Sequence, residues 1–206
     1  MPLKIASTAI IHDGVVFEGD AIVEDWCIIG NPPMGNDGSK VSTVIGDGAI
    51  IRSHTIIYSG NHIGKNFRTG NKANIRENNT IGNDVSIGTN AVVEHHVTLQ
   101  NGVRLHSQSY VPEYCVLEEG AWLGPNAVLT NTRYPLSQKD KTSPHPVHMG
   151  KEAIVGANAT ILPGVHLGKN SIVGAGSVVT HNVESCSVVA GNPAVFIKNK
   201  EDLPYE

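Results

Sequence analysis

Aliphatic residues recur at every sixth position through the middle of the chain. From Ile45 to Leu129, steps of six land on an aliphatic residue in fourteen of fifteen cases, and Thr69 is the exception. The position four residues after each of these is mostly small or aliphatic, as at Ala73 and Val97. A helix would repeat every 3.6 residues or so and a half-buried strand about every two, so neither explains this period. The pattern predicts a short strand and a corner, repeated along the chain.

The same period occurs on both sides of this stretch. A second frame runs from Ile5 to Ile29, and a third runs from Met149 to Val173. Two segments, at about 30–44 and 135–148, interrupt the frame and are rich in Gly, Pro, Asn, Asp and Ser. These residue types favour turns and irregular backbone. We therefore expect both segments to project as loops from a regular body.

Three hexads would close one triangular coil of 18 residues, and successive coils would stack at the spacing of about 4.8 Å between parallel strands. The aliphatic residues then point inward in columns, while Gly and Asn take the strained corners. Such a narrow prism has no room for rings, which agrees with an aromatic content of 5%. We predict an all-β parallel helix over residues 1–182 and an exit segment with a short tail over residues 183–206.

Composition and charge exclude several classes of protein. Charged residues make up 17% of the 206 positions, and 15 basic residues stand against 19 acidic ones, so there is no general electrostatic case for nucleic acid as a partner. No apolar run approaches the ~18 residues of a membrane span, and the first eleven residues lack the features of a signal peptide. We expect a cytoplasmic chain without a membrane partner. The three Cys form no CxxC, so the sequence suggests neither a disulfide framework nor a zinc knuckle.

Polar side chains should form vertical pairs where coils stack, because residues 18 apart lie one above another. This spacing pairs Arg76 with Glu94, Glu77 with His95, and Asn78 with His96. A carboxylate beside a histidine can hold the imidazole in one tautomer and raise its basicity. These pairs are therefore candidates for acid–base chemistry. An exposed corner could equally carry a solvated polar ladder, and both interpretations stay open on the sequence alone.

The hexads resemble those of the hexapeptide-repeat acyltransferases over nearly the whole chain. Residues 161–179 are similar to the terminal coils of that family, and residues 189–194 are similar to its exit from the prism. The resemblance implies a left-handed parallel β-helix, a homotrimer with active sites between subunits, and an acyl-CoA co-substrate. In relatives the small residues of the last coils allow the pantetheine arm to lie along the backbone.

Residues 67–78, 93–97, 106–114 and 122–131 look like nucleotide-linked amino-sugar N-acyltransferases of this family. The resemblance implies acylation, most simply acetylation, of the amine of a dTDP- or UDP-amino-deoxyhexose. Residues 130–135 lack the catalytic histidine of the galactoside- and serine-type relatives.

The candidate site residues follow from this resemblance and from the stacked pairs. For catalysis they are Glu94, His95, His96 and Glu77. For substrate contact they are Asn74, Arg76, His106, Asn131 and Tyr134, with Pro32 and Pro33 near the nucleotide base. For coenzyme A they are Ala157, Ala175, Lys169 and Lys198.

Two other functions compete with this hypothesis. A metalloenzyme like the γ-class carbonic anhydrases would share the β-helix, but that class uses an H-x4-H pair among its zinc ligands. No H-x4-H occurs among the ten histidines, and His145 and His148 form an isolated pair in the second loop, so we expect no metal. The other alternative is a non-catalytic β-helix that acts as a scaffold. The two loops argue against a scaffold, because they would cover a cleft.

Overall fold

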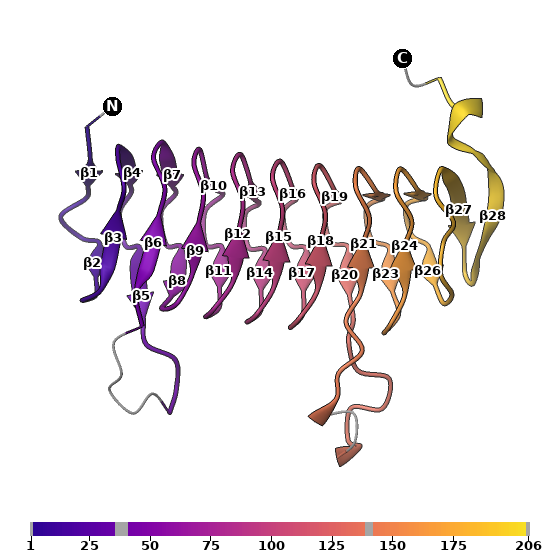
Figure 1. The fold of residues 1–206 in the computed structure, drawn as a ribbon, viewed down its shortest axis with the longest axis horizontal. Coiled ribbons are helices and arrows are strands. Elements are labelled where there is room, and N and C mark those ends of the chain that lie inside the picture. Colours follow the sequence, from indigo (N-terminus) through magenta and orange to yellow (C-terminus); the bar gives the residue numbers. More distant parts are fainter. Residues whose placement is uncertain (1, 36–40, 139–141, 205–206) are drawn as a thin grey trace.

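The computed structural model describes residues 2–35, 41–138 and 142–204, and these residues form a prism with three faces (Figure 1). The chain winds around one long axis, and each coil adds one strand to each of three parallel sheets in turn, which we call A, B and C. Sheet A contains β1 (Lys4–Ile5), β4 (Ala21–Val23), β7 (Ala49–Ile51), β10 (Arg68–Thr69), β13 (Ser86–Ile87), β16 (Arg104–Leu105), β19 (Trp122–Leu123), β22 (Ile154–Val155), β25 (Ile172–Val173), β27 (Ser187–Gly191) and β28 (Ala194–Asn199).

The other two faces are built in the same way. Sheet B contains β2 (Ile10–Ile11), β5 (Ile28–Asn31), β8 (Ile56–Tyr58), β11 (Asn74–Ile75), β14 (Val92–Val93), β17 (Tyr110–Val111), β20 (Val128–Leu129), β23 (Thr160–Ile161) and β26 (Val178–Val179). Sheet C contains β3 (Val15–Phe17), β6 (Thr43–Ile45), β9 (His62–Ile63), β12 (Thr80–Ile81), β15 (Thr98–Leu99), β18 (Val116–Leu117), β21 (His148–Met149) and β24 (His166–Leu167). The named strands pair in parallel except β27 with β28, which is followed by a 3-10 turn, η1 (Lys200–Asp202).

The strand register confirms the 18-residue coil. Asn74 pairs with Val92 across sheet B, and the same offset of 18 recurs through the central coils. The offset grows to 28 where Val15 pairs with Thr43, and to 32 where Leu117 pairs with Met149. The two loops therefore insert ten and fourteen residues into an otherwise regular helix. Parallel pairing continues into β27, beyond the expected boundary at residue 182.

The aliphatic column forms the core, as the hexad frame predicted. All fifteen positions from Ile45 to Leu129 are buried, including Thr69. The expectation that no ring fits inside was wrong at one place, because Phe67 is fully buried. Phe67 lies in the same coil as Thr69, where the column has its smallest member, so that coil has room for a larger side chain. The first coil is open at the end of the prism, and its Ile5 is 39% exposed.

The corner glycines are of two kinds, and only some of them, such as Gly60 with a φ of 82°, share the strained conformation of the corner asparagines. Asn78, Asn90 and Asn126 have positive φ values of 61°, 54° and 55°, as expected for strained corners. The glycines that directly follow the aliphatic column do not share this conformation. A Cβ on Gly46 would lie 2.7 Å from the carbonyl carbon of Gly64 in the next coil. The sequence-based explanation was wrong for these glycines, which are required by the close approach of adjacent coils rather than by φ.

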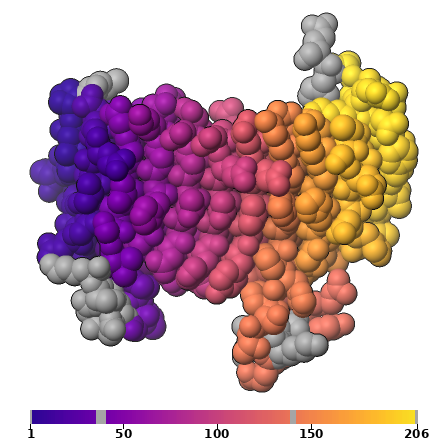
Figure 2. Space-filling view, in the orientation of Figure 1, coloured from indigo at the N-terminus to yellow at the C-terminus, as the bar shows by residue number. Residues whose placement is uncertain are grey.

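Both loops leave the prism at the corner between sheets B and C, which we call the B–C corner. The first loop connects β5 to β6, and the second connects β20 to β21. Residues 36–40 and 139–141 of these loops lie outside the described residues. The two loops extend from the same long edge of the prism and leave the edge between them uncovered (Figures 1 and 2).

Candidate active site

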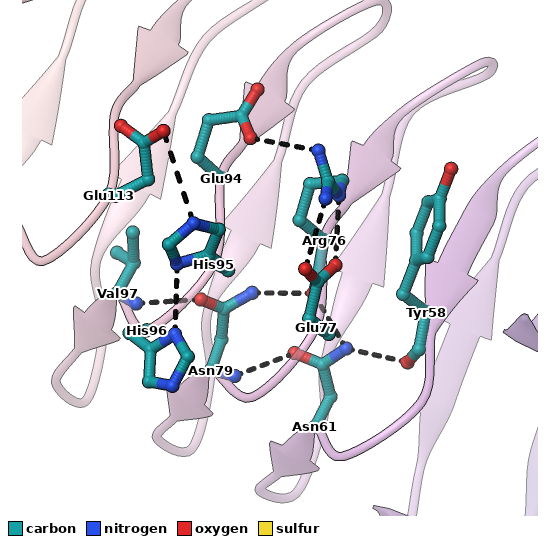
Figure 3. A network of polar contacts seen from close by, with 10 residues as sticks. All are labelled: Tyr58, Asn61, Arg76, Glu77, Asn79, Glu94, His95, His96, Val97 and Glu113. Atoms are coloured by element: carbon teal, nitrogen blue, oxygen red, sulfur yellow. Dashed lines mark hydrogen bonds and ion pairs between the residues drawn. The ribbon is translucent and has the colours of Figure 1, made fainter. Parts of the chain in front are cut away.

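The uncovered stretch of the B–C corner carries the polar residues of the three predicted vertical pairs. Between the two loops, the B–C corner has four turns without an insertion, at residues 58–61, 76–79, 94–97 and 112–115. Because the coils stack in register, each position of one corner lies next to the same position of the following corner. These residues therefore form vertical columns of polar side chains (Figure 3).

One column contains Glu77, His95, Glu113 and Asn131, each 18 residues after the one before. His95 Nε2 lies 4.0 Å from Glu113 Oε1, and Asn131 Nδ2 donates to Glu113 Oε2 at 2.6 Å. Glu113 is thus the carboxylate in contact range of His95, whereas the sequence had paired His95 with Glu77. The 18-residue spacing that suggested Glu77 also leads from His95 to Glu113, so the signal for this missed residue was present in the sequence.

A second column is centred on Arg76, which joins two carboxylates. Its guanidinium donates to Glu77 through Nε at 2.8 Å and through Nη2 at 3.0 Å, and Nη1 lies 3.3 Å from Glu94 Oε2. The guanidinium also stacks over the ring of Tyr58, 5.2 Å from its centroid. The predicted stacking of Arg76 on Glu94 is therefore confirmed. Glu77, by contrast, is held by its neighbour Arg76 rather than by His95.

The environments of the two glutamates shift their pKa values in opposite directions. Burial raises the pKa of Glu94, and the Glu113 and Glu77 carboxylates add to this rise, although the Arg76 charge opposes it. Burial also disfavours ionisation of Glu77, but the hydrogen bonds from Arg76 outweigh it and lower the pKa of Glu77. Glu77 is therefore a fixed anion, while Glu94 is the carboxylate more easily protonated.

Tyr110 on β17 lies near the same charges. Burial, together with the negative charges of Glu94 and Glu113, raises the pKa of Tyr110 to about 12. Tyr110 is therefore a neutral phenol at physiological pH. It can donate a hydrogen bond but does not act as a base.

Three rings meet at the outer side of this cluster. His95 and His96 approach with their Nδ1 atoms 2.9 Å apart, and their rings pack edge to face. The His96 ring stacks on Tyr114 with centroids 5.4 Å apart, and Tyr114 is 45% exposed. The predicted vertical neighbours Asn78 and His96 thus continue into Tyr114, which the sequence hypothesis did not include.

A buried pair of amides supports the corners that carry these side chains. Asn61 Nδ2 and Asn79 Nδ2 both donate to the carbonyl oxygen of Arg76, at 2.8 and 2.7 Å. Asn79 Oδ1 accepts from the backbone N–H of Val97 at 2.7 Å, and Asn61 Oδ1 accepts from the N–H of Asn79 at 3.1 Å. These contacts connect three successive corners inside the prism. The sequence contained a signal for these contacts, because Asn61 and Asn79 occupy an inward position that is small or aliphatic in most other hexads.

Not every predicted site residue joins this cluster. Asn74 lies on β11 of sheet B, and its buried Oδ1 has no hydrogen-bond partner among the described residues. His106 follows β16 and lies at the corner between sheets A and B, which we call the A–B corner, with its ring 4.5 Å from that of Trp122. Within one chain, His106 is therefore on the other edge of sheet B from the residues of this corner. Pro32, Pro33 and Tyr134 lie in the described parts of the two loops.

The residues proposed for coenzyme A lie away from this cluster in the same chain. Ala157 and Ala175 lie at the A–B corner, and Ala175 lines a groove of about 610 Å³ with Gly156, Gly174 and Lys200. Lys169 is at the corner between sheets C and A, and Lys198 Nζ lies 3.5 Å from the carbonyl oxygen of Asp202. Lys200, which the sequence hypothesis missed, is the lysine that lines the groove.

Among the described residues, no group of three or more His, Cys, Asp or Glu side chains could hold a metal ion. His148, one of the two loop histidines considered above, instead lies 2.8 Å from Glu118 and packs its ring against His166. In the part of the chain that the structure describes, no helix has the length and hydrophobicity needed to cross a membrane.

The comparisons with known proteins concern the repeat and the fold. The family model described as the hexapeptide repeat of succinyl-transferase matches residues 146–181. The matched residues run from β21 to β26, in the last coils of the prism. The UDP-N-acetylglucosamine acyltransferase of Bacteroides fragilis superposes with a TM-score of 0.64 at 14% identity, covering 96% of this chain and 75% of that chain. This similarity confirms the predicted fold, a left-handed parallel β-helix.

Two curated relatives match shorter segments of the chain. A protein of Dictyostelium discoideum named as an acetyltransferase is 48% identical over 82 residues, which is 38% of this chain and 43% of that protein. A protein of Lysinibacillus sphaericus named as a macrolide acetyltransferase is 44% identical over 52 residues, which is 25% of this chain and 29% of that protein. The chain therefore spans less than half the length of the curated relatives it matches.

Proposed function

We propose that this chain transfers an acyl group, most simply acetyl, from acyl-CoA to the amine of a nucleotide-linked amino-deoxy sugar. The observation that carries the proposal is the group of three carboxylates, Glu77, Glu94 and Glu113, around His95 at the uncovered B–C corner. The names of both curated relatives support acetyl transfer, and the structural neighbour from Bacteroides fragilis is named for a UDP-linked amino sugar.

The cluster suits an amine better than a hydroxyl acceptor. One arginine stands against three carboxylates, so the local charge favours a cationic amine. The amine must lose a proton before it attacks the thioester, and a partly buried carboxylate or a neutral imidazole can accept that proton. Glu94 with His95 or His96 would orient the amine and accept the proton, while Asn74, Arg76, Glu77 and Asn131 would contact the sugar.

The same proposal assigns residues to the nucleotide of the sugar substrate and to coenzyme A. Pro32 and Pro33 of the first loop and Tyr134 of the second would contact the nucleotide. Acyl-CoA would occupy the groove beside Ala175, with Ala157 along the pantetheine arm. Lys169, Lys198 and Lys200 are the candidates for contact with its phosphates, since an ammonium acts there as a point charge.

A homotrimer would bring the two halves of this site together. In one chain Ala175 lies four coils from Glu94, about 19 Å along the axis at about 4.8 Å per coil, and on the opposite edge of sheet B. The outward positions of sheet B between these edges are largely apolar, including Ile28, Ile56, Val92 and Val128. Packing of this face against other copies would bury it and set the A–B corner of one copy beside the B–C corner of another. Sedimentation equilibrium tests the trimer directly.

The test of the function is thiol release from acetyl-CoA with a panel of dTDP- and UDP-amino sugars, with mass spectrometry of the product. We expect N-acylation of at least one amino sugar and none of its hydroxyl analogue. Glu94→Gln should cut turnover by about 10–10⁴-fold if it accepts the proton. Glu18→Gln, an exposed carboxylate near the first coil, serves as the matched control. Protein that binds acetyl-CoA in calorimetry but acylates no amine would contradict the proposal.

A further inference from the structure

The contact between His95 and His96 constrains where their protons lie. Their Nδ1 atoms are 2.9 Å apart, which is a hydrogen-bond distance (Figure 3). A neutral imidazole has one N–H and one acceptor nitrogen. Two bare nitrogens at this distance would repel each other, and two N–H groups would clash, so one proton lies between them. The tautomers of the two rings are therefore coupled.

The outer nitrogens of the two rings face different surroundings. His95 Nε2 faces the carboxylate cluster, 4.0 Å from Glu113 Oε1, which is too long for a direct hydrogen bond. An amine nitrogen about 2.9 Å from each of these atoms would fit against both. His96 is exposed, and its other nitrogen points away from the carboxylates (Figure 3). The pair thus connects the inside of the cluster with solvent.

The backbone at His96 indicates that the fold itself does not select a histidine there. His96 has a φ of 57°, a left-handed conformation that costs a non-glycine residue about 1–2 kcal/mol. In the two preceding coils the same corner position is occupied by Gly60 and Asn78, which tolerate positive φ best. Tyr114 of the next coil has a φ of 64° at the same position, so the conformation belongs to the corner and is independent of the side chain.

We propose that His95 and His96 form a two-histidine proton relay that carries the proton of the substrate's ammonium group from the cluster to solvent. This inference rests on the proposed function. In the starting state His95 carries its proton on Nδ1 and donates to His96 Nδ1, which leaves His95 Nε2 as the acceptor. His95 Nε2 takes a proton from the ammonium, the Nδ1 proton of His95 moves to His96 Nδ1, and His96 Nε2 releases its proton to water. After the products leave, His95 Nε2 gives its proton to water, the shared proton returns to His95 Nδ1, and His96 Nε2 takes a proton from water, which restores the starting tautomers with no net transfer.

The proton balance of the reaction agrees with one exported proton. The neutral amine attacks the thioester carbonyl, the N–C bond forms, and the C–S bond breaks to release the thiolate. The second proton of the amine nitrogen ends on the thiolate sulfur. Acylation of an ammonium by a thioester therefore releases one net proton per turnover, and that is the proton the relay carries.

The charged groups around the pair bring the cationic substrate to His95. Glu77, Glu94 and Glu113 face His95 from three successive corners, and Arg76 neutralises part of their charge. The remaining negative charge attracts the ammonium group to this side of the pair. Tyr114 lies against both rings, 5.5 Å from His95 and 5.4 Å from His96, and keeps the His96 ring in place.

The test is His96→Asn, since asparagine already occupies this conformation at Asn78. In dilute buffer we expect kcat for the amine to fall about tenfold or more, with KM for acetyl-CoA unchanged. Added imidazole or concentrated buffer should restore the rate, because a small base can carry the proton in place of His96. A loss of structure alone would not be reversed in this way. His62→Asn, an exposed histidine on β9 of sheet C, is the control. A rate equal to wild type and independent of buffer would overturn the relay.

A second measurement separates failure of the relay from failure of the proposed function. Nitrogen-15 NMR of the histidine rings in the wild-type protein should show one ring protonated at Nδ1 and the other bare at Nδ1. In His96→Asn this coupled pair should disappear. If the wild type acylates no amine, the proposed function fails while the NMR signature still tests the coupled pair. If both rings titrate as independent histidines with no shared proton, the relay fails even where acylation is observed.

Discussion

The buried side chain of Asn79 allows a sharp test of how the interior supports the B–C corner. Asn79 occupies an inward position that is Val97 in the next coil, so valine fits this geometry. Asn79→Val removes two hydrogen bonds, one from Nδ2 to the Arg76 carbonyl oxygen at 2.7 Å and one from the Val97 N–H to Oδ1 at 2.7 Å. The substitution replaces an amide with an apolar group of similar size.

The two losses are unequal. The Arg76 carbonyl oxygen keeps the hydrogen bond from Asn61 Nδ2 at 2.8 Å, so it stays paired. The Val97 N–H is left buried without this acceptor, which costs about 1–3 kcal/mol. Burial of the added methyl surface offsets roughly 1 kcal/mol of that cost. The expected net loss of up to about 2 kcal/mol lowers Tm by up to about 8 °C for a chain of this size.

Thermal unfolding followed by circular dichroism measures this effect. The control is Thr80→Val, an exposed position on the adjacent strand β12, which should change stability by less than about 0.5 kcal/mol. Turnover should fall in Asn79→Val and stay near wild type in Thr80→Val, because Asn79 holds the backbone of Arg76. An Asn79→Val protein as stable and as active as wild type would refute the assignment of the amide pair as the support of this corner.

Two further predictions concern the core and the carboxylates. Phe67→Ala removes a fully buried ring and should lower the free energy of unfolding in urea by about 3–5 kcal/mol. A decrease below about 1 kcal/mol would show that the coil closes over the cavity. Since the pKa of Glu94 is raised in the folded state, its stabilising contribution is lost as pH rises from about 4.3 through the folded value. Glu94→Gln should therefore gain Tm relative to wild type between pH 4 and pH 7. The pKa of Glu77 is lowered, so its contribution is present above about pH 4.3 and lost as pH falls through the folded value. The Tm deficit of Glu77→Gln at pH 7 should therefore shrink below pH 4, and a parallel pH response of the two variants would count against opposite shifts.

Much of the fold could be predicted because the repeat is local. A side chain every sixth residue must point inward if each hexad is a strand and a corner, so the frame from Ile45 to Leu129 determined the core and the 18-residue register. The same register predicted the contact of Arg76 with Glu94. It could not assign a partner to Glu77, because the adjacent Arg76 competes for that carboxylate through two shorter hydrogen bonds.

The sequence by itself determined the hexad frame, the places of the two loops and the columns of polar residues. The three-dimensional structure was needed to assign each residue to a corner of the prism. It separated His106 from the cluster, brought Glu113 beside His95, and turned the Nδ1 atoms of His95 and His96 toward each other. The physical reason is that a period of six sets which residues face inward, whereas side-chain rotamers and competing charges decide which polar groups meet at a corner.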